Sequence, residues 1–200
     1  MRIFETYQTL ILALIQYYLD NGYFYIQCFH YPESKQDKWA SLDAKLTGKF
    51  SLDLNKAQRH YRKNRNIANV VGLRCRGLCL LLHTPGAKSW DESNESFTDL
   101  RIKPLTIPLG KVVNIQLSLQ EVTKNEKTKI VGMVKFEKRS YQGLKEIVKS
   151  TATMLPKQQI IEMKMIKNLP AVRRRMHLQK EHLLELYRSE CKRHGRKPLA

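Results

Sequence analysis

The pattern of apolar and polar residues near the start of the chain predicts one helix followed by one strand. Apolar side chains recur with helical spacing over about Phe4–Leu19, and Gly22 tolerates the positive φ that suits a helix end. Aromatic and β-branched residues are then dense over Tyr23–Tyr31, which indicates a strand, and Pro32 ends it. We expect the helix to pack on the rest of the fold.

The middle of the chain predicts two helices and then two paired strands. Trp39–Gly48 has apolar residues at helical spacing, and Asp53 is placed to cap a second, mostly polar helix over Asn55–Asn64. The apolar segments Val70–Cys75 and Leu78–Leu82 predict two strands joined by a tight turn. The second strand is apolar throughout, so we expect it at the centre of a sheet.

The last part of the chain predicts a hairpin and three helices. Val112–Leu119 and Lys129–Phe136 indicate two strands joined by the polar connection Thr123–Thr128. Pro156 breaks the first of the following helices, and Pro170 opens the last. The apolar faces expected on the three helices are, in chain order, Leu144, Ile147, Val148 and Thr151; Ile160, Ile161 and Met165; and Val172, Met176, Leu183, Tyr187 and Cys191, with Gln179 interrupting the last stripe.

This order of elements predicts an α+β fold with a largely antiparallel mixed sheet, packed helices and a helical C-terminal third. We expect two parts: an α+β domain over residues 1–153, beginning with the packing helix, and a basic helical module over residues 154–200. The apolar stripe of the last helix predicts core packing, with docking of another protein subunit as the alternative.

The net charge of the chain narrows the classes of partner that the sequence favours. The 200 residues include 36 Lys plus Arg and 18 Asp plus Glu, a net charge of +18. The excess lies in three blocks, residues 35–77, 101–150 and 151–200, whereas residues 1–34 and 78–100 are net acidic. A compact protein of this charge repels itself, and a polyanion relieves that repulsion. The charge therefore favours a nucleic-acid partner over a merely solvated basic surface.

Two clusters are the main candidates for phosphate contact. The first lies on the predicted helix near residue 60, where His60 and Tyr61 could also stack on bases. The second opens the last helix, where arginines oppose the helix dipole unless phosphates compensate them. The full set of candidates, with two cations of the predicted strand turn, is Lys56, Arg59, His60, Tyr61, Arg62, Lys63, Arg65, Arg74, Arg76, Arg173, Arg174, Arg175, Lys180, Arg188, Lys192 and Arg193.

Two strand segments offer possible platforms for bases. Arg76 and Gly77 followed by Leu78–His83 resemble part of the RNA-recognition-motif octapeptide, but Leu78, Leu80 and His83 stand where that family has stacking aromatics. The likeness is therefore a hint of fold only. The strand Tyr23–Tyr31 has more aromatic residues and would suit single-stranded bases if it were exposed. The alternative is ordinary burial in the sheet.

A nuclease is the competing hypothesis. A metal-dependent nuclease needs acidic groups near a Lys or His, and such residues gather in and beside the acidic loop. A metal-free ribonuclease could instead use His30, His60 or His83 as general acid and base. The loop candidates are His83, Asp91, Glu92, Asp99 and Lys103.

We expect no cofactor and no metal, because the sequence has no phosphate-binding Gly-rich loop, and Cys75, Cys79 and His83 lack zinc-knuckle spacing. The first helix has too short an apolar run to span a membrane, and the four cysteines do not form a secreted disulfide framework. The sequence thus predicts a cytoplasmic, non-enzymatic protein. We expect it to bind structured RNA in preference to DNA, as a subunit of a ribonucleoprotein or mobile-element assembly.

Overall fold

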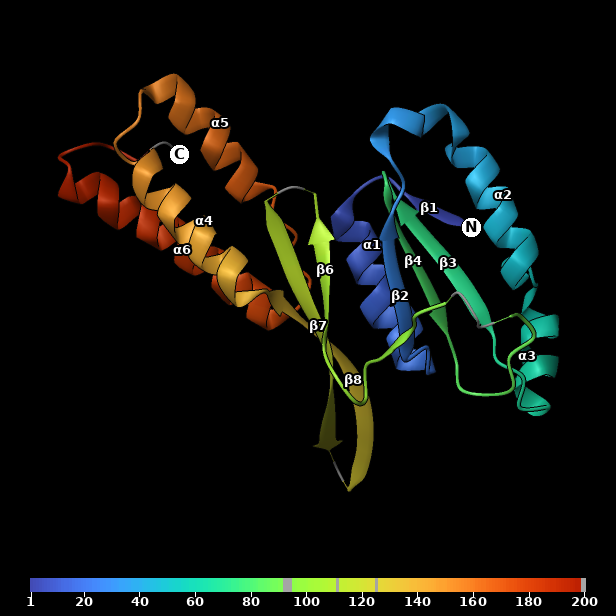
Figure 1. The fold of residues 1–200 in the computed structure, drawn as a ribbon. Helices are drawn as coiled ribbons and strands as arrows, with labels where there is room; N and C mark the ends of the chain where they lie inside the picture. The colour runs from blue at the N-terminus through green and yellow to red at the C-terminus, as the bar shows by residue number, and fades with distance from the viewer. Residues whose placement is uncertain (92–94, 111, 125, 199–200) are drawn as a thin grey trace. The chain divides into compact units, whose positions relative to one another are not determined.

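The structure, a computed structural model, places most of the chain in two compact units (Figure 1). It describes all residues except 92–94, 111, 125 and 199–200 and the side chains of 124 and 127. The first unit contains residues 1–105 and 117–133, and the second contains residues 106–116 and 134–200. Both units combine helices with strands, so the predicted α+β class is confirmed. The domain boundary after residue 153 stays a prediction.

The first unit contains a five-stranded sheet with the order β1-β3-β4-β2-β5. Only β1 and β3 pair in parallel, and the other neighbours are antiparallel. The predicted central strand, β4, has all six residues buried. Arg76, in the turn between β3 and β4, has a φ of 53°. The strands are β1 (Arg2–Phe4), β2 (Tyr25–His30), β3 (Val70–Cys75), β4 (Leu78–His83) and β5 (Thr98–Asp99).

The predicted first helix is shorter than expected, because the residues before it form strand β1. The α-helix α1 (Tyr7–Ala13) continues through the π-helical turn η1 (Leu14–Tyr18) and the 3₁₀ turn η2 (Leu19–Asn21). As predicted, Gly22 ends this segment in the left-handed conformation, with a φ of 88°. Its apolar face is buried at Leu10, Ile11, Leu14 and Ile15.

Two α-helices lie between β2 and β3. The 3₁₀ segment η3 (Glu33–Lys38) leads into α2 (Trp39–Phe50), which is slightly longer than predicted, and α3 (Lys56–Asn64) follows. Phe50 at the end of α2 packs in one cluster with Val70 and Leu81 of the sheet. The α2 helix thereby covers the sheet and brings the chain to α3 at its C-terminal end (Figure 1).

The three-stranded antiparallel sheet has the order β6-β7-β8, and the predicted hairpin is confirmed. Its middle strand is longer than predicted, and β6 was not predicted. The strands are β6 (Leu105–Leu109), β7 (Val113–Lys124) and β8 (Lys127–Phe136), and the helices of the second unit are α4 (Lys138–Thr151), α5 (Pro156–Lys167) and α6 (Arg174–Arg193). Among the described residues, no helix is both long enough and apolar enough to cross a membrane.

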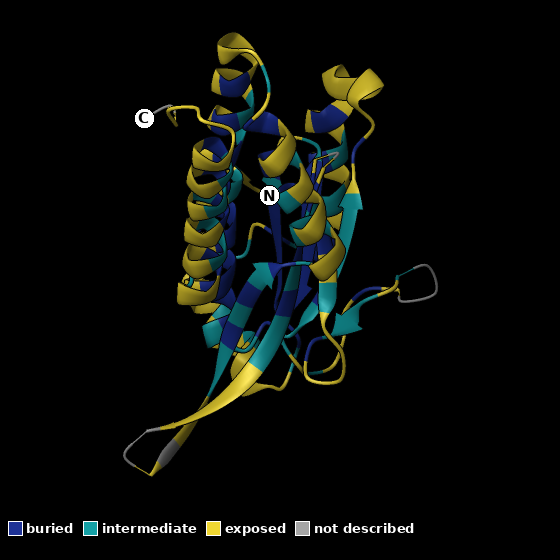
Figure 2. Cartoon of the chain, turned by 90° about the vertical axis from the view of Figure 1, so that its left-hand side faces the viewer, coloured by how far each residue is buried: buried dark blue, intermediate teal, exposed yellow. Residues whose placement is uncertain are grey.

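The apolar stripe of α6 is buried within the second unit, as the core-packing prediction requires. Met176, Leu183, Tyr187 and Cys191 are all at most 2% exposed, and α6 packs against α4 and α5. The helix begins at Arg174 and not at the predicted Pro170, so Val172 precedes it and is half-buried. The outer sides of the helices remain exposed (Figure 2). The interruption at Gln179 is also explained, because its side-chain oxygen accepts the backbone N–H of Phe136 at 2.9 Å. The stripe predicted as an alternative docking face is therefore occupied by this chain's own helices.

The predicted apolar face of α5 is wrong at two positions. Ile160 and Ile161 are 57% and 67% exposed, and the helix instead buries Gln159, Met163 and Ile166. The amide of Gln159 donates to the backbone carbonyl of Met154 at 2.9 Å and accepts the Tyr187 hydroxyl at 3.0 Å. The face of α5 that is buried is therefore the one on which the Gln159 amide can form its hydrogen bonds.

Candidate nucleic-acid interface

The basic helix α3 begins with a capping box. The side chain of Asn55 accepts the backbone N–H of Gln58 at 2.9 Å, and the side chain of Gln58 accepts the backbone N–H of Asn55 at 2.8 Å. This reciprocal pair satisfies two donors at the start of the helix. The cap is therefore Asn55, and the predicted cap at Asp53 is wrong.

One arginine of α3 belongs to the fold. The guanidinium of Arg59 donates to three backbone carbonyls, those of Leu54 at 3.0 Å, Val70 at 2.8 Å and Leu52 at 3.0 Å. These bonds fasten the helix to the loop before it and to the start of β3. Because its donors bind backbone carbonyls of the protein, Arg59 anchors α3 to the fold.

The other cations of this segment are Lys56, Arg62 and Lys63 on α3 and Arg65, which directly follows the helix. Lys56, Lys63 and Arg65 are exposed, and no carboxylate of the described residues lies within ion-pair distance of them. Arg62 is half-buried and donates to the hydroxyl of Ser89, while its second terminal nitrogen has no hydrogen-bond partner in the described part of the chain. The helix therefore presents uncompensated positive charge, which is the arrangement that phosphate binding requires.

The two ring-bearing candidates of α3 differ in how they are held. A ring nitrogen of His60 lies 3.1 Å from the side-chain amide nitrogen of Asn64 one turn later. Tyr61 is 53% exposed, and the guanidinium of Arg65 lies 4.4 Å from the centre of its ring. This cation–π contact orders an aromatic ring among the free cations of the helix.

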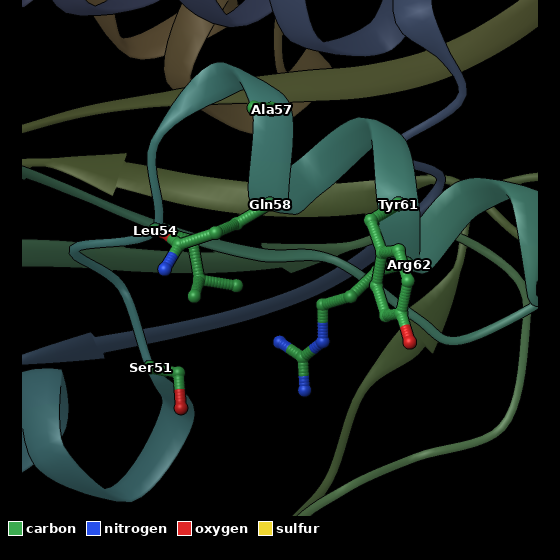
Figure 3. A pocket seen from close by; sticks show the side chains of 6 residues that line it. All are labelled: Ser51, Leu54, Ala57, Gln58, Tyr61 and Arg62. Atoms are coloured by element: carbon green, nitrogen blue, oxygen red, sulfur yellow. The ribbon is translucent and has the colours of Figure 1, made fainter.

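A groove runs beside α3 on the side where Tyr61 and Arg62 lie (Figure 3). It has a volume of about 610 Å³, and its lining combines apolar side chains with an aromatic ring and a guanidinium. The lining residues are Ser51, Leu54, Ala57, Gln58, Tyr61 and Arg62. Four of these six were not predicted from the sequence. The spacing of Asn55 and Gln58 is the only local signal that could have pointed to them, because it marks the helix start.

The two candidate cations near the β3–β4 turn have different environments. Arg74 forms an ion pair with Asp43 at 3.0 Å, and its guanidinium lies 5.4 Å from the Trp39 ring centre. Its side chain is only 11% exposed, so Arg74 stabilises the fold. Arg76 is exposed and lies 5.7 Å from the ring centre of Tyr7.

The α6 helix places its cations at its two ends. Arg174 and Arg175 are exposed near the first turn, and Arg188 and Lys192 are exposed near the last. Arg173 precedes the helix and is half-buried, and one of its guanidinium nitrogens has no partner among the residues that the structure describes.

The middle of α6 is not a cationic surface. Glu181 and Glu185 are exposed between the two basic ends. At the C-terminal end of the helix, Arg193 approaches Glu190 at 3.6 Å. Lys180 donates to the backbone carbonyls of Lys167 and Leu169 at the end of α5, and burial lowers the pKa of its amine. The helix thus carries exposed cations, exposed acidic residues and one lysine, Lys180, that is bound to backbone carbonyls of the same unit.

Two of the predicted nuclease residues, His83 and Asp99, form contacts within the fold. The His83 ring is 1% exposed, stacks on Tyr25 with ring centres 4.4 Å apart, and has a nitrogen 2.8 Å from the Thr84 carbonyl oxygen. Asp99 pairs with Arg101 at 2.6 Å, and hydrogen bonds from this arginine hold the pKa of the Asp99 carboxyl below its usual range.

The remaining nuclease candidates do not complete a metal site in the described part of the chain. Asp91 and Lys103 are exposed, and Glu92 lies outside the described residues. Over the residues that the structure describes, no group of three His, Cys, Asp or Glu side chains is placed to hold a metal ion.

The two strands that were candidate platforms for bases pack against the rest of the fold. The predicted aromatic strand is shorter in the structure, where β2 begins at Tyr25. Tyr23, just before β2, is buried, and Phe29 of β2 packs against the core cluster around Phe50. On β4, Leu78 and Leu80 are both fully buried. The burial alternative is thus confirmed for Tyr23, and α3 carries the exposed aromatic residue of the candidate interface.

Comparison with known proteins identified no relative of this chain. No protein-family model, curated protein or solved structure matches this chain. The proposals below are therefore based on the contacts of its own residues.

Proposed function

We propose that this protein is a non-enzymatic nucleic-acid-binding protein that contacts the phosphate backbone through α3. The observation that carries this proposal is the exposed set Lys56, Lys63 and Arg65, which has no carboxylate partner among the described residues. The net charge of +18 supports it, because such a surface gains by neutralisation with a polyanion. The exposed cations of α6 provide a second, weaker contact.

Structured RNA is the favoured ligand. The groove beside α3 combines an exposed aromatic ring with apolar side chains, and it adjoins the free cations. RNA loops and bulges display unstacked bases next to phosphates, whereas a DNA duplex keeps its bases in the stack. An aromatic groove next to cations therefore suits RNA better than duplex DNA.

Removing the free charge of α3 tests the proposal. The α3 variant carries Lys56→Gln, Lys63→Gln and Arg65→Gln. Each lost phosphate contact weakens binding about tenfold at 0.1 M salt, so we expect a loss of about 100- to 1000-fold for a stem-loop RNA. The slope of log K against log salt concentration should decrease by about 2 to 3. Fluorescence anisotropy over a salt series measures both quantities.

A matched control removes the same charge elsewhere in the first unit. The α2 control carries Lys35→Gln, Lys38→Gln and Lys45→Gln, three exposed lysines on or before α2. We expect a much smaller loss, because these lysines lie outside α3 and do not line the groove. Equal losses in the two triple variants would show that total charge, and not α3, determines binding. A stem-loop that fails to bind the unaltered protein at low salt would contradict the proposal itself.

The nuclease hypothesis makes a separate prediction. If the protein cleaves RNA or DNA, Asp99→Asn or Asp91→Asn should abolish cleavage and leave binding intact. Incubation of the unaltered protein with labelled RNA and DNA, with and without Mg²⁺, tests this directly. The contacts of two of the candidates do not favour cleavage, because Asp99 is engaged by Arg101 and His83 is packed among aromatic rings.

A further inference from the structure

We propose that the groove beside α3 binds a single unpaired nucleobase, with the base stacked against Tyr61 and its acceptor edge facing Arg62 and Gln58. This inference rests on the proposed function and adds a base-binding subsite to its phosphate contacts. It predicts a preference for uracil or guanine over adenine.

The size and lining of the groove suit a flat, partly apolar ligand. Its volume of about 610 Å³ lies within the range of small-molecule sites, which are mostly apolar with a few placed polar groups. Leu54 and Ala57 supply apolar surface, and Figure 3 shows the lining side chains of Leu54, Tyr61 and Arg62 extending to the same side of α3. A phosphate alone would leave this apolar surface unused.

Tyr61 provides the surface for stacking. Its ring is 53% exposed although it lines a groove, and the Arg65 guanidinium lies 4.4 Å from its centre. That contact limits the motion of the ring before a ligand arrives. Base–aromatic stacking is tolerant of sequence and contributes a large part of single-strand binding, so an ordered, exposed ring is a suitable base platform.

Arg62 has a guanidinium donor to spare. Arg59, one turn earlier, donates to three backbone carbonyls. Arg62 donates to the Ser89 hydroxyl, and its other terminal nitrogen is buried and has no hydrogen-bond partner among the described residues. A buried donor without a partner is costly, and a carbonyl oxygen of a ligand would relieve that cost after a small rotation of the side chain.

The other polar groups of the groove select the edge of the base. The oxygen of the Gln58 amide already accepts the Asn55 N–H, so the NH₂ group of Gln58 remains as a donor. Arg62 can only donate, and Ser51 adds a hydroxyl. A donor-rich groove matches bases with carbonyl oxygens, such as uracil and guanine, and it disfavours adenine, whose exocyclic amine is itself a donor.

Oligonucleotides with and without bases test the inference. The probes are labelled ten-residue RNAs made of uridine, of adenosine, or of abasic ribose phosphate. The variant is Tyr61→Ala, and the control is Tyr17→Ala, which removes a tyrosine that is 60% exposed and does not line the groove. We expect Tyr61→Ala to weaken uridine binding about tenfold and to leave abasic binding unchanged. The control should change neither.

The expected base preference adds a second readout. The unaltered protein should bind the uridine probe more tightly than the adenosine probe, and Arg62→Gln should reduce that difference. The outcomes are separable from those of the proposed function. If abasic and uridine probes bind equally and Tyr61→Ala affects neither, the groove does not hold a base, although phosphate binding stands. If none of these probes binds although the stem-loop RNA does, this inference fails and the proposed function stands. If the stem-loop RNA does not bind either, both fail.

Discussion

The helices α3 and α6 both carry clusters of arginine and lysine, yet the structure gives their charge different uses. On α3, one arginine anchors the helix and the others meet no carboxylate within ion-pair distance in the described residues. On α6, Glu181 and Glu185 are exposed between the basic ends, and Lys180 binds carbonyls of α5. The number of cations on a helix therefore does not measure the charge that it offers to a ligand.

Charge removal on the two helices should give the largest difference. The α6 variant carries Arg174→Gln, Arg175→Gln and Arg188→Gln and removes the same charge as the α3 variant. Because nearby carboxylates already weaken the field on α6, we expect about a tenfold loss of RNA affinity, against 100-fold or more for α3. Anisotropy titrations at 0.1 M salt compare the two. A larger loss in the α6 variant would reverse the ranking.

Replacing the anchoring arginine should affect stability first. Arg59→Gln leaves three backbone carbonyls without their charged donor, so we expect a loss of about 3 kcal/mol in the free energy of unfolding. Lys56→Gln, on the exposed side of the same helix, should change stability by less than about 0.5 kcal/mol. Urea denaturation measures both. Equal stability of the two variants would show that Arg59 is not an anchor.

The corresponding test on α6 concerns its polar interruption. Gln179→Leu removes the acceptor of the buried Phe136 N–H, which should cost about 2 kcal/mol. The control is Gln158→Leu, at an exposed position of α5. Thermal unfolding of the two variants distinguishes a lost hydrogen bond from a general effect of leucine. An unchanged melting temperature in Gln179→Leu would contradict the role given to this bond.

Removing acidic charge from α6 should strengthen binding slightly. If α6 is a weaker contact because Glu181 and Glu185 oppose phosphates, Glu181→Gln with Glu185→Gln should raise RNA affinity by a few-fold at low salt. The same anisotropy assay measures the change, which should disappear at high salt. No gain would mean that α6 does not lie near the bound RNA.

The smallest effect concerns Lys180 and pH. Burial lowers the pKa of its amine below 10.5 in the folded protein, so the unfolded chain binds more protons between the two pKa values. Stability contributed by this group therefore increases as the pH rises through that interval. The difference in unfolding free energy between the unaltered protein and Lys180→Met, measured from pH 8 to pH 11, should show this rise. A constant difference would contradict it.

The sequence predicted the elements well where pattern and burial coincide. The uniformly apolar strand β4 is central, Gly22 ends its helix, and the α6 stripe is buried. It failed where tertiary contacts decide. Short strands such as β1 have too few residues for a periodic pattern, and α5 buries Gln159 while two isoleucines are exposed.

The candidate site shows the same limit more strongly. The sequence located the basic helix α3, but it could not separate Arg59, which binds carbonyls, from Arg65, which is exposed. It grouped Arg74 with the binding residues, although Asp43, 31 positions earlier, neutralises it. The direction of a side chain and partners distant in sequence determine which cations remain available to a ligand. Neither can be predicted from the local spacing of residues.

The most direct measurement is photo-cross-linking of the unaltered protein to a stem-loop RNA that carries 4-thiouridine in its loop, followed by mass spectrometry of the attached peptides. If α3 and its groove hold the RNA, the cross-linked peptides will come from residues 51–65 and will include Tyr61. Cross-links confined to residues 174–193 would contradict that assignment and make α6 the principal contact.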